Sequence, residues 1–302
     1  MKYKLDFSHP LQARKWLKLL EPHKRFGFLI KRDKVLPQSL LGFSFSSNRL
    51  GLRGPCNQKA GIVCMGTSYA MGFSVNNGNN WWELMGSDSD NILNLGLPVG
   101  IAEWLELAKL YYNGKRDTLL LLYHANWYSH EEQYSRWRQT RQRVHEFFRW
   151  KTTLTDCTLL SLRTSIGLRN QAKKYLFSSH DGLVYRFDLS YCTSNNQIPI
   201  DSLIELRNFA MQFSRTIVIN LPCKEDLISE GNLKLDLCNN LRTNHSAKWN
   251  GMISIFSGIP NITIHNWKPS SLQCYLPFDT HLSTKGNQEL ADIIKTLLNR
   301  QV

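Results

Sequence analysis

The sequence lacks any hydrophobic run long enough to cross a membrane. Residues 119–123 form an apolar block that is no longer than a strand, whereas a transmembrane helix needs about 20 such residues. The first residues of the chain also lack the apolar centre that defines a signal peptide. We therefore expect no transmembrane segment and a cytoplasmic location.

Cysteine pairs and metal-binding patterns are missing too. The seven cysteines are odd in number and include no Cys-x-x-Cys pair, which argues against a disulfide framework and against a zinc site. The sequence contains no Walker phosphate loop and no cluster of metal ligands. We expect no bound metal and no bound cofactor. Cys64 and Cys223 lie in apolar segments, where core packing is their predicted role.

Acidic residues are scarce relative to basic ones. The chain has 24 aspartates and glutamates against 37 lysines and arginines, so its net charge is +13. This balance favours an anionic partner such as nucleic acid, anionic lipid, an acidic glycan or a phosphate-bearing donor. Binding to nucleic acid would rest on charge alone, so we do not expect nucleic acid as a partner.

Short apolar runs alternate with segments of helical spacing from about residue 61 onward. The strand-like runs are 61–66, 92–96, 118–124, 216–221 and 262–267. The helical segments are 103–110, 200–213, 234–256 and 283–298. Strands that alternate with helices predict a parallel sheet covered on both faces. We expect an α/β fold with three layers, α/β/α, and a flavodoxin-like five-stranded sheet of order 2-1-3-4-5.

Two parts of the sequence fall outside this alternation. Residues 1–60 are basic and rich in turn-forming residues, and we interpret them as a leader that packs on the edge of a domain formed by 61–302. Residues 128–199, between the third and fourth strands, are long for a loop, so we predict an insertion with its own structure. Its segment 134–151 interleaves basic and aromatic residues, which would form either a wall for an anionic ligand or a solvated helix.

The segment that ends the first predicted strand points to chemistry. An apolar run stops at Gly66-Thr67-Ser68, and Gly72 follows, which is typical of a tight turn that exposes a hydroxyl. Near the other end of the chain, Asp279 and His281 supply an acid and a base. A free hydroxyl is a poor nucleophile near neutral pH and needs such a base, so these residues suggest serine nucleophilic catalysis.

A further polar residue, Asn126, follows the third predicted strand. In the expected strand order its strand lies beside the strand that ends before Ser68, so the two side chains should meet at the carboxyl edge of the sheet. Each residue also has a purely structural interpretation: Ser68 could cap a helix, His281 could be a surface histidine, and Asn126 could simply end a strand.

Five segments of the sequence resemble motifs of the SGNH (GDSL-type) hydrolase superfamily, in the order that the family has them. They are 47–54, 66–72, 94–100, 123–126 and 279–286, and the resemblance covers about residues 45–302. Three positions depart from the family pattern. Thr67 replaces the usual aspartate of Gly-Asp-Ser, Val99 stands where a glycine is usual, and Asp279 and His281 are one residue closer than in the family's Asp-x-x-His.

The resemblance implies a role for each matching residue. Ser68 would be the nucleophile, His281 the general base and acid, and Asp279 the residue that orients the imidazole. The oxyanion hole would use the backbone N–H groups of Ser68 and Gly100 and the side-chain N–H of Asn126. If the shortened spacing keeps Asp279 from its role, a Ser–His dyad would remain.

The resemblance also implies the reaction class, which is ester hydrolysis or O-acetylation of a carbohydrate. We expect O-acetylation of a polysaccharide, such as a capsule, or of its precursor, with acetyl-CoA as the donor. The phosphates of acetyl-CoA would account for part of the positive charge. A carbohydrate O-acetylesterase is the first alternative, and an inactive module that binds an acidic glycan through its basic insertion is the second.

Overall fold

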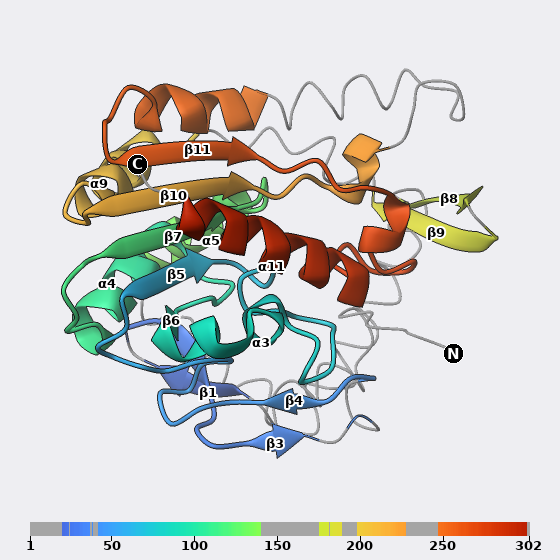
Figure 1. Ribbon diagram of the computed structural model, residues 1–302, viewed down its shortest axis with the longest axis horizontal. Coiled ribbons are helices and arrows are strands. Elements are labelled where there is room, and N and C mark those ends of the chain that lie inside the picture. The colour runs from blue at the N-terminus through green and yellow to red at the C-terminus, as the bar shows by residue number, and fades with distance from the viewer. Residues whose placement is uncertain are drawn as a thin grey trace.

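The computed structural model describes residues 20–23, 25–36, 38, 42–139, 175–180, 182–188, 198–227 and 247–300. Its centre is a five-stranded sheet of order β11-β10-β7-β5-β6, in which every pairing is parallel (Figure 1). The strands are β5 (Ile62–Gly66), β6 (Ile92–Asn94), β7 (Thr118–Tyr123), β10 (Arg215–Asn220) and β11 (Ile262–Asn266). The expected α/β fold with a parallel sheet is therefore confirmed.

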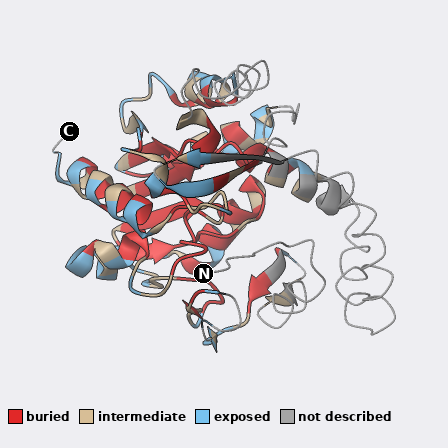
Figure 2. Cartoon of the chain, turned by 90° about the vertical axis from the view of Figure 1, so that its right-hand side faces the viewer, coloured by how far each residue is buried: buried red, intermediate tan, exposed pale blue. Residues whose placement is uncertain are grey.

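Helices pack against both faces of this sheet. They are α3 (Trp81–Leu84), α4 (Ile101–Tyr111), α5 (Trp127–Gln139), α9 (Ile200–Ala210) and α11 (Thr284–Asn299). Successive strand side chains point to opposite faces. Val63 and Leu121 accordingly share one buried core with α4 and α9, whereas Cys64 and Leu122 share another with α3 and α11. Figure 2 shows in red how much of the sheet is buried, although the edge strand β11 is only partly buried.

The predicted helix boundaries agree with the structure in part. Ser283 caps α11 as expected, because its hydroxyl accepts the backbone N–H of Gly286 at 3.3 Å. Helix α9 stops at Ala210, short of the predicted end at 213, because the chain must turn there to enter β10. Of the predicted helix 234–256, residues 247–256 are helical and 234–246 lie outside the described residues. None of the helices in the described ranges is long and apolar enough to cross a membrane.

The described parts of residues 1–60 form small hairpins beside the sheet. These contain β1 (Leu20–His23), β2 (Gly27–Ile30), β3 (Val35–Leu36) and β4 (Phe45–Ser46). Cys56 forms an antiparallel bridge with Leu93 at the edge strand β6. Phe45 and Leu52 are fully buried in the same core as α4. This segment thus supplies core residues as well as lying along the sheet edge.

The insertion at 128–199 is described at its beginning and near its end. It starts within α5, and it later forms a hairpin of β8 (Tyr175–His180) and β9 (Leu183–Asp188). The basic and aromatic side chains of 136–151 lie outside the part of the insertion that can be described. The hairpin projects beyond the carboxyl ends of β10 and β11 in Figure 1.

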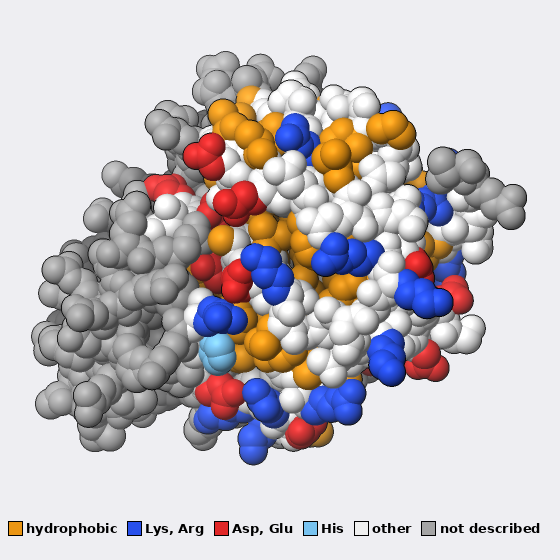
Figure 3. Space-filling model, turned by 90° about the vertical axis from the view of Figure 1, so that its left-hand side faces the viewer, with side chains coloured by type: hydrophobic (Ala, Val, Ile, Leu, Met, Phe, Trp, Pro, Cys, Tyr) orange, Lys and Arg blue, Asp and Glu red, His pale blue; other side chains and the backbone are white. Residues whose placement is uncertain are grey.

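All five strands run in one direction, so their carboxyl ends share one edge, which is where α/β folds bind ligands. Figure 3 shows the molecule from the opposite side, where lysine and arginine side chains are spread singly and acidic ones lie among them. The positive charge is therefore not gathered into one patch on that face.

Candidate active site

Ser68 lies just past the carboxyl end of β5, in a series of turns that covers residues 68–74. This turn does not lead directly into a helix, because the next helix, α3, begins only at Trp81. The reason is the backbone conformation, since Gly72 has φ +61° and Ser74 has φ +73°, which no helix accommodates. Ser68 is held in this turn through its carbonyl, which accepts the backbone N–H of Phe73 at 2.9 Å.

His281, from the other end of the chain, reaches this turn. Its Nε2 lies 2.7 Å from the Oγ of Ser68, and its Nδ1 lies 2.6 Å from Oδ1 of Asp279. An ionised carboxylate can only accept a hydrogen bond, so in the neutral imidazole the proton is on Nδ1. Nε2 is then the acceptor for the hydroxyl proton of Ser68. The three groups form a continuous chain of hydrogen bonds that aims a base at the serine.

The environment of Asp279 favours its ionised form. Burial alone would raise the pKa of this carboxyl, but the facing His281 and the hydrogen bonds to the carboxylate outweigh burial and lower it. One of these bonds comes from the hydroxyl of Ser74, which donates to Oδ2 at 2.9 Å. The side chains of Asp279 and His281 are only 17% and 13% exposed. Asp279 is thus a charged acceptor in a partly dry site at neutral pH.

The short spacing between Asp279 and His281 is accommodated by a local turn. Oδ1 of Asp279 accepts the backbone N–H of His281 at 3.1 Å as well as the ring N–H. A carboxylate that bonds to the backbone two residues on forms an Asx turn. The turn brings the carboxylate back toward the imidazole, so the missing residue does not separate the pair.

Asn126 and Thr67 link the ends of the two neighbouring strands, β7 and β5. The hydroxyl of Thr67 donates to Oδ1 of Asn126 at 3.2 Å, and both side chains are buried. Asn126 therefore contacts the residue before Ser68, and the expected meeting of the Asn126 and Ser68 side chains stays a prediction. With Oδ1 engaged by Thr67, the side-chain donor of Asn126 is its Nδ2 group. Thr67 thus orients the amide from the position where the family has an aspartate.

Replacing Thr67 with valine tests this orienting role. Valine keeps the shape and loses the hydrogen bond, which is worth about 1 kcal/mol. If Ser68 is a nucleophile, we expect its rate of reaction to fall about fivefold to tenfold with little change in KM. Initial-rate kinetics on a simple acetyl ester measure this. Thr67→Ser, which keeps the hydroxyl, should retain most of the rate; equal losses in both variants would contradict the orienting role.

Gly100 is the predicted site residue that the structure does not tie to Ser68. A Cβ at this glycine would lie 2.5 Å from Oε2 of Glu103 and 2.8 Å from Oε2 of Glu131, so Gly100 packs against α4 and α5. The neighbouring N–H of Val99 donates to the carbonyl of Leu97 at 2.8 Å. The role of Gly100 as an oxyanion donor therefore stays a prediction.

Several residues at this edge of the sheet escaped the sequence analysis. Tyr69 donates its hydroxyl to the carbonyl of Thr280 at 2.7 Å, and its ring centroid lies 5.1 Å from that of His281. Phe73 lies 5.0 Å from the same imidazole, so aromatic rings hold the base in place. The one sequence feature that could have indicated Tyr69 and Phe73 is that both follow Ser68 closely in the chain.

Another buried contact joins His124, which follows β7, to Cys223, which follows β10. Nδ1 of His124 accepts the backbone N–H of Asn126 at 3.2 Å, so its Nε2 carries the proton and faces the sulfur of Cys223 at 3.3 Å. Cys64 and Cys223 are both buried, in agreement with their predicted packing role. This contact helps to fix the backbone at Asn126.

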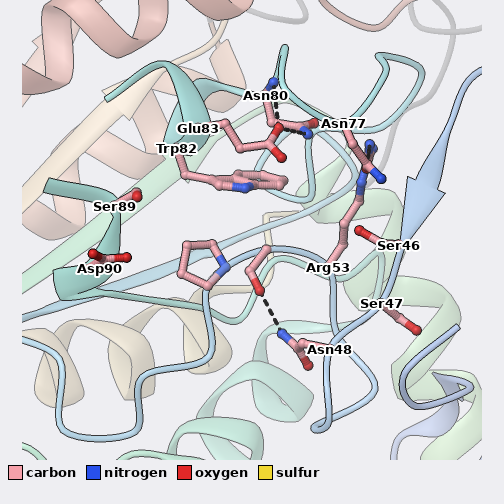
Figure 4. A pocket seen from close by; sticks show the side chains of 12 residues that line it. Ser46, Ser47, Asn48, Arg53, Asn77, Asn80, Trp82, Glu83, Ser89 and Asp90 are labelled. Atoms are coloured by element: carbon pink, nitrogen blue, oxygen red, sulfur yellow. Dashed lines mark hydrogen bonds between the residues drawn. The ribbon is translucent and has the colours of Figure 1, made fainter. Parts of the chain in front are cut away.

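Arg53 anchors the turn that carries Ser74. Its guanidinium is buried and donates to the carbonyls of Gly72, Ser44 at 3.2 Å and Val75 at 2.8 Å. Burial lowers the pKa of Arg53 to about 10, which still leaves it charged at neutral pH. Figure 4 shows Arg53 at the side of a polar cavity of about 320 Å³.

Replacing Arg53 with lysine should destabilise the protein by about 2 kcal/mol or more. A single ammonium cannot reach all the carbonyls that the guanidinium fork serves, so buried acceptors lose their donors. Unfolding in urea, followed by tryptophan fluorescence, measures the change. Arg300→Lys, at an exposed position after α11, is the matched control and should have no effect. Equal stability of the two variants would contradict the anchoring role.

Two comparisons of the sequence with known proteins found nothing similar. A scan against protein-family models found no match, and a search of curated proteins found none either. Within the described ranges, no group of three or more His, Cys, Asp or Glu residues could hold a metal ion.

Proposed function

We propose that this protein transfers acyl groups through a covalent intermediate on Ser68. The observation that carries the proposal is the chain of hydrogen bonds from Ser68 through His281 to Asp279, at 2.7 and 2.6 Å. These distances are those that a serine nucleophile and its base require. The lowered pKa of Asp279 supports the proposal, because an ionised partner stabilises the imidazolium that forms when His281 takes a proton.

The proposed reaction has two steps. In the first, His281 takes the hydroxyl proton of Ser68 as Oγ attacks the acyl carbon; the tetrahedral intermediate then expels the donor's leaving group, to which His281 returns the proton. In the second, His281 takes a proton from the acceptor hydroxyl, which attacks the acyl-Ser68 ester. Collapse of this second intermediate releases the acylated acceptor and restores the proton to Ser68. If water is the acceptor, the product is a free acid.

The negative charge on each intermediate needs hydrogen-bond donors. Nδ2 of Asn126 and the backbone N–H of Ser68 are the donors we propose, and Gly100 remains the proposed third. The buried position of Asn126, 8% exposed, supports this role, because a donor fixed in a partly dry site needs no reorganisation as charge develops.

The fold supports the same proposal at a coarser level. Numbered along the sheet's own strands, the order β6-β5-β7-β10-β11 reads 2-1-3-4-5. Together with helices on both faces, this order supports a three-layer, flavodoxin-like arrangement and membership of the SGNH superfamily. In such folds ligands bind at the carboxyl edge of the sheet, and Ser68 lies at that edge.

For the substrate, we propose an acetyl group transferred from acetyl-CoA to a hydroxyl of a polysaccharide or its precursor in the cytoplasm. The net charge of +13 fits a donor that carries several phosphates. The test is to incubate the protein with acetyl-CoA and candidate glycans and to follow the glycan by mass spectrometry. A gain of acetyl groups that Ser68→Ala abolishes supports transfer. Rapid hydrolysis of simple acetyl esters, without use of acetyl-CoA, would favour the esterase alternative.

One observation favours the inactive, glycan-binding alternative. The N–H of Val99, at the position where the resemblance implies a glycine donor, is already bonded to the carbonyl of Leu97 at 2.8 Å, so a donor there would have to be the neighbouring Gly100. An inactive module would bind an acidic glycan without turnover, and its Ser68 would not react with a fluorophosphonate. A protein that consumes acetyl donor at a rate dependent on Ser68 excludes this alternative.

A further inference from the structure

Lys224 is a buried lysine that lies behind the acid–base pair. It begins the short 3₁₀ helix Lys224–Leu227, which follows β10 at the carboxyl edge of the sheet, and it is 0% exposed. Its ammonium donates to the carbonyl of Asp279 at 2.8 Å and to those of Leu276 and Pro277 at 3.3 Å each. Three carbonyls of one loop are thus among the acceptors of this ammonium.

Backbone carbonyls of the loop 276–279 therefore surround the buried ammonium of Lys224. Burying an ammonium is costly unless it is fully hydrogen-bonded, so any movement of these carbonyls away from Lys224 is opposed by the cost of leaving the charge unsolvated. The acceptors are backbone oxygens, which means that Lys224 controls the path of the main chain directly. This path ends at the residue whose side chain meets His281.

The β8–β9 hairpin of the insertion contacts both Lys224 and the loop 276–279. The ring of Phe187, in β9, lies with its centroid 5.7 Å from the ammonium of Lys224, which is within range of a cation–π contact. The backbone N–H of Arg186 donates to the carbonyl of Pro277 at 2.7 Å. Lys224 thus joins the acid loop to the insertion.

We propose that Lys224 is a positioning residue for the acid–base pair. It holds the main chain at Asp279, while Ser74 holds the carboxylate and Tyr69 holds the carbonyl of Thr280. Fixing the chain at these points keeps Oδ1 of Asp279 at 2.6 Å from the imidazole, the kind of precision that a catalytic hydrogen bond needs. The effect of Lys224 on reaction rate rests on the proposed function, whereas its effect on the geometry does not.

The test compares Lys224→Met and Lys224→Arg with wild type. We measure the second-order rate constant for reaction of Ser68 with a fluorophosphonate probe, and thermal unfolding for each variant. We expect Lys224→Met to react about 10- to 100-fold more slowly, because displacing a catalytic group by about 1 Å has an effect of that size. Lys224→Arg, which keeps the charge and donors, should recover part of the rate and keeps the test usable if the methionine variant fails to fold.

Lys295→Met is the matched control. Lys295 also donates its ammonium to a backbone carbonyl, that of Leu84 at 2.9 Å, but it does so from α11 and away from the acid loop. Its replacement should leave the rate of labelling unchanged. A loss equal to that of Lys224→Met would mean that the rate reports general loosening, and it would overturn the proposal.

A double-mutant cycle separates positioning from other effects. If Lys224 acts through Asp279, then Lys224→Met should cause no further loss in an Asp279→Asn background. Equal losses in both backgrounds would overturn the proposal, and so would an unchanged rate in Lys224→Met.

The proton NMR signal of the Nδ1–H of His281 gives a readout that needs no activity. In wild type we expect a downfield resonance from its hydrogen bond to Asp279, and in folded Lys224→Met we expect it to shift upfield or broaden. A signal that Lys224→Met leaves unchanged would overturn the positioning role. If wild type does not react with the probe, the proposed function is wrong. The positioning role of Lys224 still holds in that case if Lys224→Met changes this resonance.

Discussion

Replacing Ser68 with alanine should lower the turnover number by about 10⁴- to 10⁶-fold and leave the folded structure intact. The hydroxyl is the group that would form the covalent intermediate, and alanine offers no substitute for it. The free energy of unfolding should change little. Ser68 is only half-buried, and the variant loses one hydrogen bond, to Nε2 of His281. Hydrolysis or transfer of an acetyl group gives the rate, and urea unfolding gives the stability.

His281→Ala should cause nearly the same loss, and the double variant should lose no more than either single one. Residues that act as a unit in catalysis are strongly non-additive, because once one is missing the other has no partner. Losses that multiply in the double variant would indicate that Ser68 and His281 act separately, and would contradict the proposed hydrogen-bonded pair.

Replacing Asp279 with asparagine should lower the turnover number by about 10⁴-fold. Asparagine has the same shape, but its amide can present N–H groups to the imidazole and favour the wrong tautomer of His281. Nδ1 would then no longer carry the proton, and Nε2 could not accept one from Ser68. Steady-state kinetics with an acetyl donor measure the loss.

The size of this effect separates a triad from a dyad. A loss of less than about tenfold would mean that Ser68 and His281 suffice, as the shortened spacing in the sequence allowed. Ser74→Ala is a milder change at the same carboxylate, for comparison with Asp279→Asn. It removes one hydrogen bond to Oδ2 of Asp279 and keeps the charge, so its effect should be much smaller.

The charge of Asp279 also predicts how stability depends on pH. The pKa of Asp279 is lowered in the folded chain, so folding favours the ionised carboxylate more than the protonated one. The resulting stabilisation is present above the ordinary pKa of 3.8 and is lost as the pH falls below that value. The difference in free energy of unfolding between wild type and Asp279→Asn should therefore narrow below pH 3.8.

The sheet could be predicted from the sequence because its signals are local. Each strand is a short apolar run bounded by turn residues, and burial on both faces explains why these runs do not alternate with polar residues, as in 62–66 and 119–123. The ends of the helices were harder to place. Helix α9 stops where the chain must enter β10, and this depends on the tertiary structure rather than on residues 211–213 themselves.

The residues of the candidate triad could be predicted because each lies next to a recognisable local signal. Ser68 follows a strand, and His281 precedes the N-cap of the last helix. Lys224 and Arg53 could not be predicted in the same way, since most of the hydrogen-bond partners shown for them are backbone carbonyls. Every residue has such a carbonyl, so no sequence pattern marks the ones that are bound. The positive φ of Ser74, which keeps the chain after Ser68 from forming a helix, has no marker in the sequence either.

Reaction of the purified wild-type protein with a fluorophosphonate, followed by peptide mass spectrometry, tests the central claim most directly. We predict one adduct per chain, located on Ser68, formed slowly in Asp279→Asn and absent from Ser68→Ala and His281→Ala. A folded wild-type protein that takes up no probe, or one that is labelled equally well without His281, would contradict the claim that an imidazole from the end of the chain activates this serine.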